Sequence, residues 1–136
     1  MNFFLMLAMV LFLMLPCCAQ SDHLIAQEMV GKWCYISETA ATDNNHSNSC
    51  ITLQADGSYE AVLDRSSFAN GTPFPISQDA DRGTWWVKDN RLFYNSDSNG
   101  ESSFAFQKQN HPRNESIPLI IVNGIMFATA SAHEPW

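Results

Sequence analysis

After residue 31, short runs of aromatic and β-branched residues alternate with clusters of Gly, Asn, Asp and Ser. This pattern is typical of an all-β fold, in which strands of roughly 4–8 residues lie between turn residues. It predicts strands at residues 32–38, 49–54, 58–63, 82–88, 91–95, 101–107, 117–122 and 125–130. With each strand antiparallel to the next, we expect an eight-stranded antiparallel up-and-down barrel.

A short apolar stretch before the first strand predicts an N-terminal helix. Ser21 or Asp22 is placed to cap it, and Gly31 is placed to end it in a left-handed conformation. The apolar face of this helix consists of Leu24, Ile25, Met29 and Val30.

Three turns predict how the strands pair. Asp89-Asn90 and Asn123-Gly124 are typical two-residue hairpin turns. Ala55-Asp56-Gly57 fits a three-residue loop better, because that loop pairs Leu53 with Tyr59, whereas a two-residue loop pairs Leu53 with a charged residue. The three-residue loop therefore sorts apolar and polar residues onto separate faces.

The same alternation places two cysteines on one side of the sheet. Trp33 and Tyr35 share a face of the first strand that we expect to be inward, so Cys34 points outward. The loop register turns Cys50 outward on the neighbouring strand. An even number of cysteines in an oxidising compartment favours a disulfide between Cys34 and Cys50, and two buried free thiols are the alternative.

The first residues are typical of a secretory signal. Residues 3–15 are almost entirely apolar, but this run is shorter than the ~20 residues that cross a membrane. Small residues at Cys17 and Ala19 fit cleavage after position 19. We therefore predict a signal peptide at 1–19 and no transmembrane span.

Cleavage there leaves one domain, residues 20–136, and predicts a secreted or periplasmic location. The alternative is a lipid anchor at Cys18, because the residues around it loosely resemble a lipobox.

Composition and motifs disfavour several classes of function. Fourteen Asp and Glu against seven Lys and Arg give a formal charge of −7, which disfavours nucleic acid and anionic lipid surfaces as partners. The four His are scattered without metal-ligand spacing, and the sequence contains no nucleophile elbow, zinc-protease helix or phosphate loop. We therefore expect no enzyme, no metal and no cofactor. Asp79 and Asp81 share a strand face, where we expect them to be solvated.

Three short motifs carry a likeness to a known family. Gly31-Lys32-Trp33 opens the first strand after the helix, Asp56-Gly57 makes a turn, and Gly83-Thr84-Trp85 precedes a tight turn. This order, over most of residues 20–136, resembles the lipocalin-like (calycin) barrels. In lipocalins an Arg near the end of the last strand packs over the first-strand Trp, whereas this chain has no Arg after Phe127.

The resemblance implies a barrel that binds a small apolar molecule. The chain is shorter than most lipocalins, which favours a compact relative with a small or filled interior. A periplasmic inhibitor of secreted proteases, with a similar barrel and a single disulfide between early strands, is also similar and needs no cavity.

The interior aromatic residues are the first candidate site. Eight strands leave a barrel just wide enough for side chains or one small ligand. The inward aromatics therefore either line a ligand cavity or fill the core. These residues are Trp33, Tyr35, Tyr59, Trp85, Tyr94, Phe104 and Phe106.

Two long loops are the second candidate site. The loops at 39–48 and 64–81 fall at the same end of the expected barrel, and long loops of compact domains are often functional. Phe68 and Phe74 lie in the second loop among prolines, as in a lid or an inserting inhibitor loop.

The leading hypothesis from the sequence is a lipocalin-like binding protein for a small apolar ligand. The alternative is a protein-binding module or an inhibitor of a secreted enzyme that uses the 64–81 loop.

Overall fold

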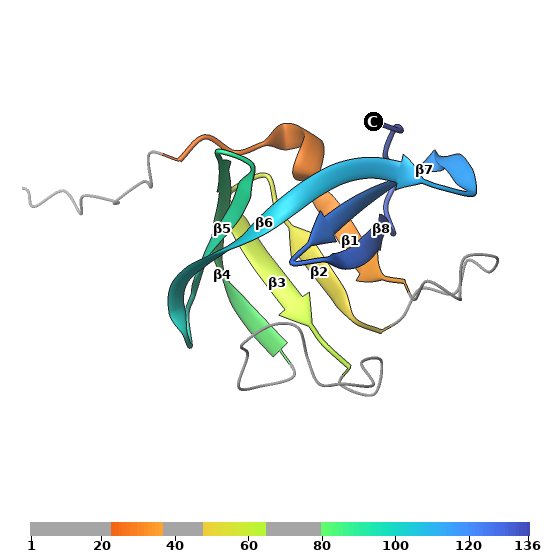
Figure 1. The fold of residues 1–136 in the computed structure, drawn as a ribbon. Helices are drawn as coiled ribbons and strands as arrows, with labels where there is room; N and C mark the ends of the chain where they lie inside the picture. The colour runs from red at the N-terminus through yellow and green to blue at the C-terminus, as the bar shows by residue number, and fades with distance from the viewer. Residues whose placement is uncertain (1–22, 37–47, 65–79) are drawn as a thin grey trace, which may run out of the picture.

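The computed structural model describes residues 23–36, 48–64 and 80–136, which form a closed antiparallel barrel (Figure 1). Each strand pairs with the next along the chain, and the last strand pairs with the first. The predicted eight-stranded up-and-down barrel is confirmed. Its strands are β1 (Gly31–Tyr35), β2 (Cys50–Leu53), β3 (Ser58–Val62), β4 (Ala80–Lys88), β5 (Arg91–Ser96), β6 (Gly100–His111), β7 (Asn114–Val122) and β8 (Ile125–Thr129).

The predicted turns set the register of the hairpins. Asp89 and Asn90 have φ angles of 52° and 59°, as a two-residue turn between right-twisted strands requires. Gly57 has a φ of 86°, which is readily adopted by a residue without a Cβ, and β2 pairs with β3 in the expected register. Trp85 pairs with Tyr94 in the next hairpin. The predicted two-residue turn at Asp89-Asn90 and the predicted pairing of Leu53 with Tyr59 are confirmed.

The strand connections alternate between two ends of the barrel. We call "closed end" the end that carries the turns at 55–57, 89–90 and 112–113, together with the segment at 130–136. We call "mouth" the opposite end, which carries the turns at 97–99 and 123–124. The orange 3₁₀ turn and the C-terminus lie together at the top of Figure 1, which is therefore the closed end.

The predicted N-terminal helix is wrong. Among the described residues, the segment before β1 contains a 3₁₀ turn at Gln27–Met29 and no α-helix. Ala26 stands at the cap position and supplies no side-chain hydrogen bond, and so few residues make a marginal helix in any case. Met29 is fully buried, whereas Leu24 is 88% exposed, so the expected apolar face does not form. The proposed caps Ser21 and Asp22 lie outside the described residues.

Two strands are longer than predicted. The sequence predicts strands at 101–107 and 117–122, but β6 extends to His111 and β7 begins at Asn114. Lys108 pairs with Ile120, so the polar residues from Lys108 onward remain in strand β6. An antiparallel sheet with one face in solvent accommodates such polar residues. The connection is a short turn, in which His111 Nδ1 accepts a hydrogen bond from the Arg113 N–H at 3.0 Å.

The core and the disulfide lie on opposite sides of the sheet. Trp33, Trp85 and Phe127 are among the largest fully buried side chains and belong to the core inside the barrel. Cys34 and Cys50 are directly opposite each other on β1 and β2 and form the predicted disulfide. The bridge therefore joins neighbouring strands from outside and leaves the interior to aromatic and aliphatic groups.

Candidate functional site: an apolar cavity in the barrel

The barrel interior contains a cavity of about 50 Å³. Leu53 and Leu92 lie beside closed-end turns and bound its deep side, while Ala61 and Leu63 lie toward the mouth. Every described lining residue except Asp81 is apolar or aromatic. The described lining consists of Ile51, Leu53, Tyr59, Ala61, Leu63, Asp81, Trp85, Leu92, Tyr94, Phe104 and Val122.

The structure brings some of the predicted interior aromatics to this cavity and places others elsewhere in the core. Tyr59, Trp85, Tyr94 and Phe104 line it. The remaining three, which belong to or pack against the core without lining the cavity, are Trp33, Tyr35 and Phe106.

Most residues of the second candidate site, the two long loops, are outside the described part of the chain. Phe68 and Phe74 are outside it, as are residues 39–47 and 65–79 of the two long loops. Ala80 and Asp81, which had been assigned to the second loop, belong instead to strand β4. The predicted signal peptide and the lipid anchor at Cys18 are likewise outside.

The aromatic wall of the cavity is ordered by ring contacts. Tyr94 stacks on Phe104 with ring centroids 5.5 Å apart, and Tyr59 meets Tyr94 edge-on at 6.1 Å. Offset stacked and edge-on rings are favoured arrangements because the ring faces are negative and the edges positive. Trp85 is held by its indole N–H, which donates to the Gln54 carbonyl oxygen at 3.0 Å. These rings form one continuous wall.

Asp81 is the charged group of the cavity. Its side chain is 9% exposed, and Tyr59 donates its hydroxyl proton to Asp81 Oδ2 at 2.7 Å. Ser96 donates to Asp81 Oδ1 at 2.7 Å and accepts backbone N–H groups from Ser98 and Asn99. Because the Ser96 oxygen is already an acceptor twice, its single proton goes to Asp81. Both donors therefore suit an ionised carboxylate.

The phenol of Tyr59 is held in its neutral form. Burial disfavours the phenolate, and the hydrogen bond to Asp81 together with the charge of that carboxylate disfavours it further. Together they hold the pKa of Tyr59 well above its usual range. Tyr59 is thus a permanent donor at neutral pH.

Gly83 allows the strands that carry the hydrogen-bond network of Asp81 to pack closely. It pairs with Tyr59 on β3 and with Ser96 on β5, so it lies between the two residues that donate to Asp81. A Cβ at this position would lie 1.9 Å from the Asn95 carbonyl oxygen, closer than any side chain can approach. Only glycine permits this spacing between β4 and β5.

Asp81 and Ser96 were missed as site residues by the sequence reasoning, and the expectation that Asp81 is solvated is wrong. The sequence did contain a signal that Asp81 points inward. Asp81, Gly83 and Trp85 are spaced two residues apart and therefore share one face of the strand. If Trp85 points inward, Asp81 does too. The predicted strand began at Arg82 and therefore did not include Asp81.

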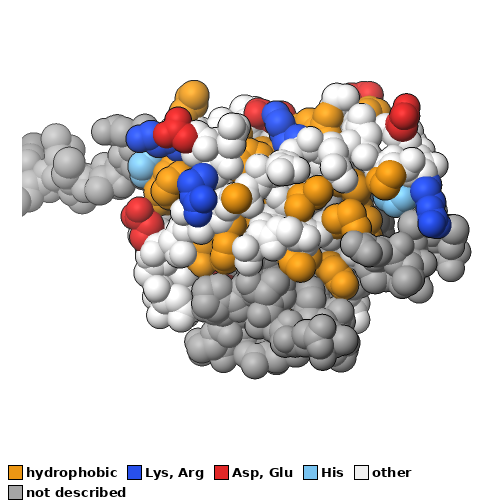
Figure 2. All heavy atoms as spheres, viewed as in Figure 1, with side chains coloured by type: hydrophobic (Ala, Val, Ile, Leu, Met, Phe, Trp, Pro, Cys, Tyr) orange, Lys and Arg blue, Asp and Glu red, His pale blue; other side chains and the backbone are white. Residues whose placement is uncertain are grey.

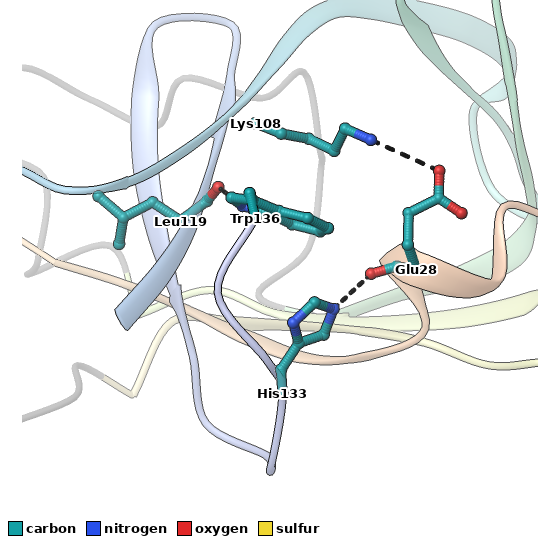
Figure 3. Close-up of polar contacts among 5 residues, drawn as sticks. All are labelled: Glu28, Lys108, Leu119, His133 and Trp136. Atoms are coloured by element: carbon teal, nitrogen blue, oxygen red, sulfur yellow. Dashed lines mark hydrogen bonds and ion pairs between the residues drawn. The ribbon is translucent and has the colours of Figure 1, made fainter. Parts of the chain in front are cut away.

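The closed end is covered by the last described residues (Figure 3). Trp136 stacks on Trp33 at 5.9 Å, and its indole N–H donates to the Leu119 carbonyl oxygen at 2.8 Å. Lys108 lies over the Trp136 ring, 5.1 Å from its centroid. Trp33 donates its own indole N–H to the Met29 carbonyl oxygen, so the 3₁₀ turn and the tail meet at one tryptophan.

Polar contacts tie the same tail to the 3₁₀ turn. His133 Nε2 donates to the Glu28 carbonyl oxygen at 2.6 Å, and the Lys108 ammonium lies 3.6 Å from the Glu28 carboxylate (Figure 3). That ion pair is largely exposed, so it contributes at most about 1 kcal/mol. The packing of Trp136 on Trp33 is the larger stabilising term, and together these contacts cover this end of the described barrel.

The outer surface carries a second hollow, of about 530 Å³, over the disulfide. Its lining is mixed, with Lys32, Thr52, Glu60 and Val62 among it. Figure 2 shows one face of the molecule, on which acidic and basic side chains are interspersed rather than sorted by sign. Neither feature offers the convergent polar groups on an apolar base that mark a small-molecule site.

Within residues 23–36, 48–64 and 80–136, no helix is long and apolar enough to cross a membrane. The same residues contain no group of three or more His, Cys, Asp or Glu side chains that could hold a metal ion. Comparisons with family models, curated proteins and solved structures gave no match.

Proposed function

We propose that this protein is a binding protein that holds the apolar part of a small molecule in the barrel cavity. The observation that carries the proposal is the lining, in which the described residues form a continuous aromatic and aliphatic wall with an apolar surface. Binding sites for small molecules are mostly apolar with a few placed polar groups.

The volume of the cavity limits the ligand. About 50 Å³ is a third of the ~150 Å³ cavity that accommodates benzene, and far below the roughly 300 Å³ and more of sites for drug-sized ligands. A fatty acid or a haem does not fit. The buried part of the ligand is therefore a short alkyl group of a few carbon atoms.

We also propose that the barrel is lipocalin-like and secreted. Support for the first point comes from Trp33, which stands near the start of β1 against a 3₁₀ turn, as in the motif order of that family. Where lipocalins place an Arg over this Trp, His133 and Trp136 pack on it at 5.4 Å and 5.9 Å. The Cys34–Cys50 disulfide supports an oxidising compartment.

Titration with 1-butanol tests the proposal, with the indole N–H signal of Trp85 followed by NMR. A saturable shift is expected in the unaltered protein. Ala61→Leu fills the cavity and should abolish the shift, while Ala105→Leu, on the exposed face of β6, should leave it unchanged. The absence of a saturable shift in the unaltered protein contradicts the proposal.

A protein-binding module or inhibitor of a secreted enzyme is the second candidate. The small size of the cavity favours it, because a nearly filled barrel needs no ligand. Phe74→Asp in the 64–81 loop should then abolish capture of one secreted partner. Leu24→Asp, at a residue that is 88% exposed, is the matched control. Equal capture by both variants excludes the loop as the binding surface.

A further inference from the structure

The start of β7 carries a sequence motif that the barrel cavity does not explain. Residues 114–116 read Asn-Glu-Ser, which matches the acceptor motif for N-linked glycans: an Asn, any residue except Pro, and then Ser or Thr. The same motif occurs at 45–47 and 70–72, outside the described residues. A glycan is bulky and hydrophilic, so the motif can be used only where the folded chain leaves it at the surface.

The structure places the motif at the surface. Asn114, Glu115 and Ser116 are all exposed, as are Pro112 and Arg113 of the preceding turn. Asn114 is the first residue of its strand, beside the 112–113 turn at the closed end. A glycan attached to Asn114 therefore displaces no core side chain, and its point of attachment is at the opposite end of the barrel from the mouth.

The hydrogen bonds of Asn114 leave its reactive atom without a described partner. Glycans are attached to the side-chain amide nitrogen, Nδ2. Asn114 Oδ1 accepts hydrogen bonds from the Ser116 hydroxyl at 2.5 Å and from the Ser116 N–H at 3.2 Å. Among the described residues, no hydrogen bond involves Nδ2. This Asx turn brings the hydroxyl of the motif against the amide group and commits only the amide oxygen.

Asn123 shows that exposure alone does not make this arrangement. It is also exposed and lies in the turn between β7 and β8. The second residue after it is Ile125, which has no hydroxyl. Asn123 is therefore a natural control for Asn114 in the same hairpin.

We propose that Asn114 is an acceptor site for an N-linked oligosaccharide. The donor is an oligosaccharide carried on a polyprenyl diphosphate, and a transferase of the secretory pathway catalyses the step. A bond forms between Asn114 Nδ2 and the anomeric carbon of the first sugar, while the bond from that carbon to the diphosphate oxygen breaks. The leaving polyprenyl diphosphate takes the electron pair, and Nδ2 gives up one proton to a base of the transferase. The proposal rests on the secreted location proposed above and is independent of the cavity.

The test expresses the full chain, residues 1–136, in cultured eukaryotic cells and collects the protein from the medium. Peptide N-glycosidase in heavy-oxygen water converts a glycan-bearing Asn into aspartate that carries the heavy isotope. Trypsin then releases residues 114–136 as one peptide, because Arg113 precedes Asn114 and no Lys or Arg follows. We expect the isotope at position 114 in most molecules, and only after glycosidase treatment. Asn123, in the same peptide, should show the same low background with and without the enzyme.

Two variants assign the modification to the motif. Ser116→Ala removes the hydroxyl and should abolish the isotope at Asn114. Ser116→Thr keeps a hydroxyl and should retain it. Both changes are at an exposed residue, so secretion should match that of the unaltered protein. The motifs at 45–47 and 70–72 do not affect this readout, because trypsin separates them from residues 114–136.

The outcomes separate this proposal from the one on which it rests. Secreted protein without the isotope at Asn114 overturns the glycan proposal and leaves the secreted location intact. Isotope that persists in Ser116→Ala also overturns it, because the motif is then not what directs the modification. Protein that stays inside the cells with residues 1–19 uncleaved contradicts the secreted location, and the glycan proposal fails with it.

Discussion

Tyr59 donates a hydrogen bond to Asp81 Oδ2 at 2.7 Å, and this contact joins β3 to β4 inside an otherwise apolar barrel. The buried carboxylate of Asp81 thereby has a hydrogen-bond donor, and Tyr59 is kept in its neutral form. The pair lies beside the apolar cavity.

The hydrogen bond between Tyr59 and Asp81 predicts how the stability of the fold changes at alkaline pH. Because the pKa of Tyr59 is raised by burial and by Asp81, one of the three tyrosines should stay protonated well above pH 10, the usual midpoint. The unfolded chain loses this proton near pH 10 while the folded chain keeps it. The stability contributed by Tyr59 is thus fully present below about pH 10 and is lost as the pH rises through the folded-state pKa.

Replacing Tyr59 by Phe checks that prediction. Tyrosine absorbance should lose its most alkaline ionisation step, and the fall of unfolding free energy above pH 10 should become shallower. Near neutral pH the variant should be less stable by about 1–3 kcal/mol, because buried Asp81 loses a donor. An unchanged alkaline step in the variant contradicts the assignment to Tyr59.

The disulfide should stabilise the fold mainly through the unfolded chain. Cys34 and Cys50 are separated by 16 residues, and closing a loop of that size contributes about 3 kcal/mol in the chain-entropy treatment. Reductant should lower the urea midpoint of the protein with residues 20–136. The double variant Cys34→Ser, Cys50→Ser should start at the lower midpoint and show no response to reductant. A response in that variant would assign the effect to something else.

Gly83→Ala tests the close approach of β4 and β5. Its Cβ would overlap the Asn95 carbonyl oxygen, so the strands must separate, at an expected cost of about 3 kcal/mol. Thr84→Ala, one residue further on the exposed face, is the control and should change the unfolding free energy by less than about 0.5 kcal/mol. Denaturation in urea measures both. Equal stability of the two variants means that the spacing is not required.

Trp136→Ala should uncover the closed end. The variant loses the stack on Trp33 and the hydrogen bond to Leu119, and a half-buried tryptophan should cost about 2 kcal/mol on truncation. The exposed Glu134 provides the matched variant, Glu134→Ala, with little expected effect. The NMR signal of the Trp33 indole N–H should shift in the first variant alone. No loss of stability in Trp136→Ala would show that the tail does not hold that end.

Local signals predicted the barrel well because its turns are short. Asp89-Asn90 and Gly57 each set a hairpin register, and period-two alternation then turned Trp33 inward and Cys34 outward. The disulfide followed from that register. Strand pairing in such hairpins is a near-neighbour property, which a single sequence carries.

The parts that failed depend on distant contacts. Trp136 packs on Trp33 although the two are far apart in the sequence, and no local sequence pattern indicates that contact. Lys108 looks like a loop residue until its pairing with Ile120 is known. Asp81 was expected to be solvated because acidic residues usually are, and only the barrel brings Tyr59 and Ser96 to it.

Intermolecular NOEs test the central claim most directly, because they locate a bound ligand. With isotope-labelled protein and 1-butanol, the account predicts NOEs from the terminal methyl group to Leu53, Trp85 and Leu92 inside the barrel. NOEs instead to Val62 and Thr52, in the hollow outside the disulfide, would contradict it.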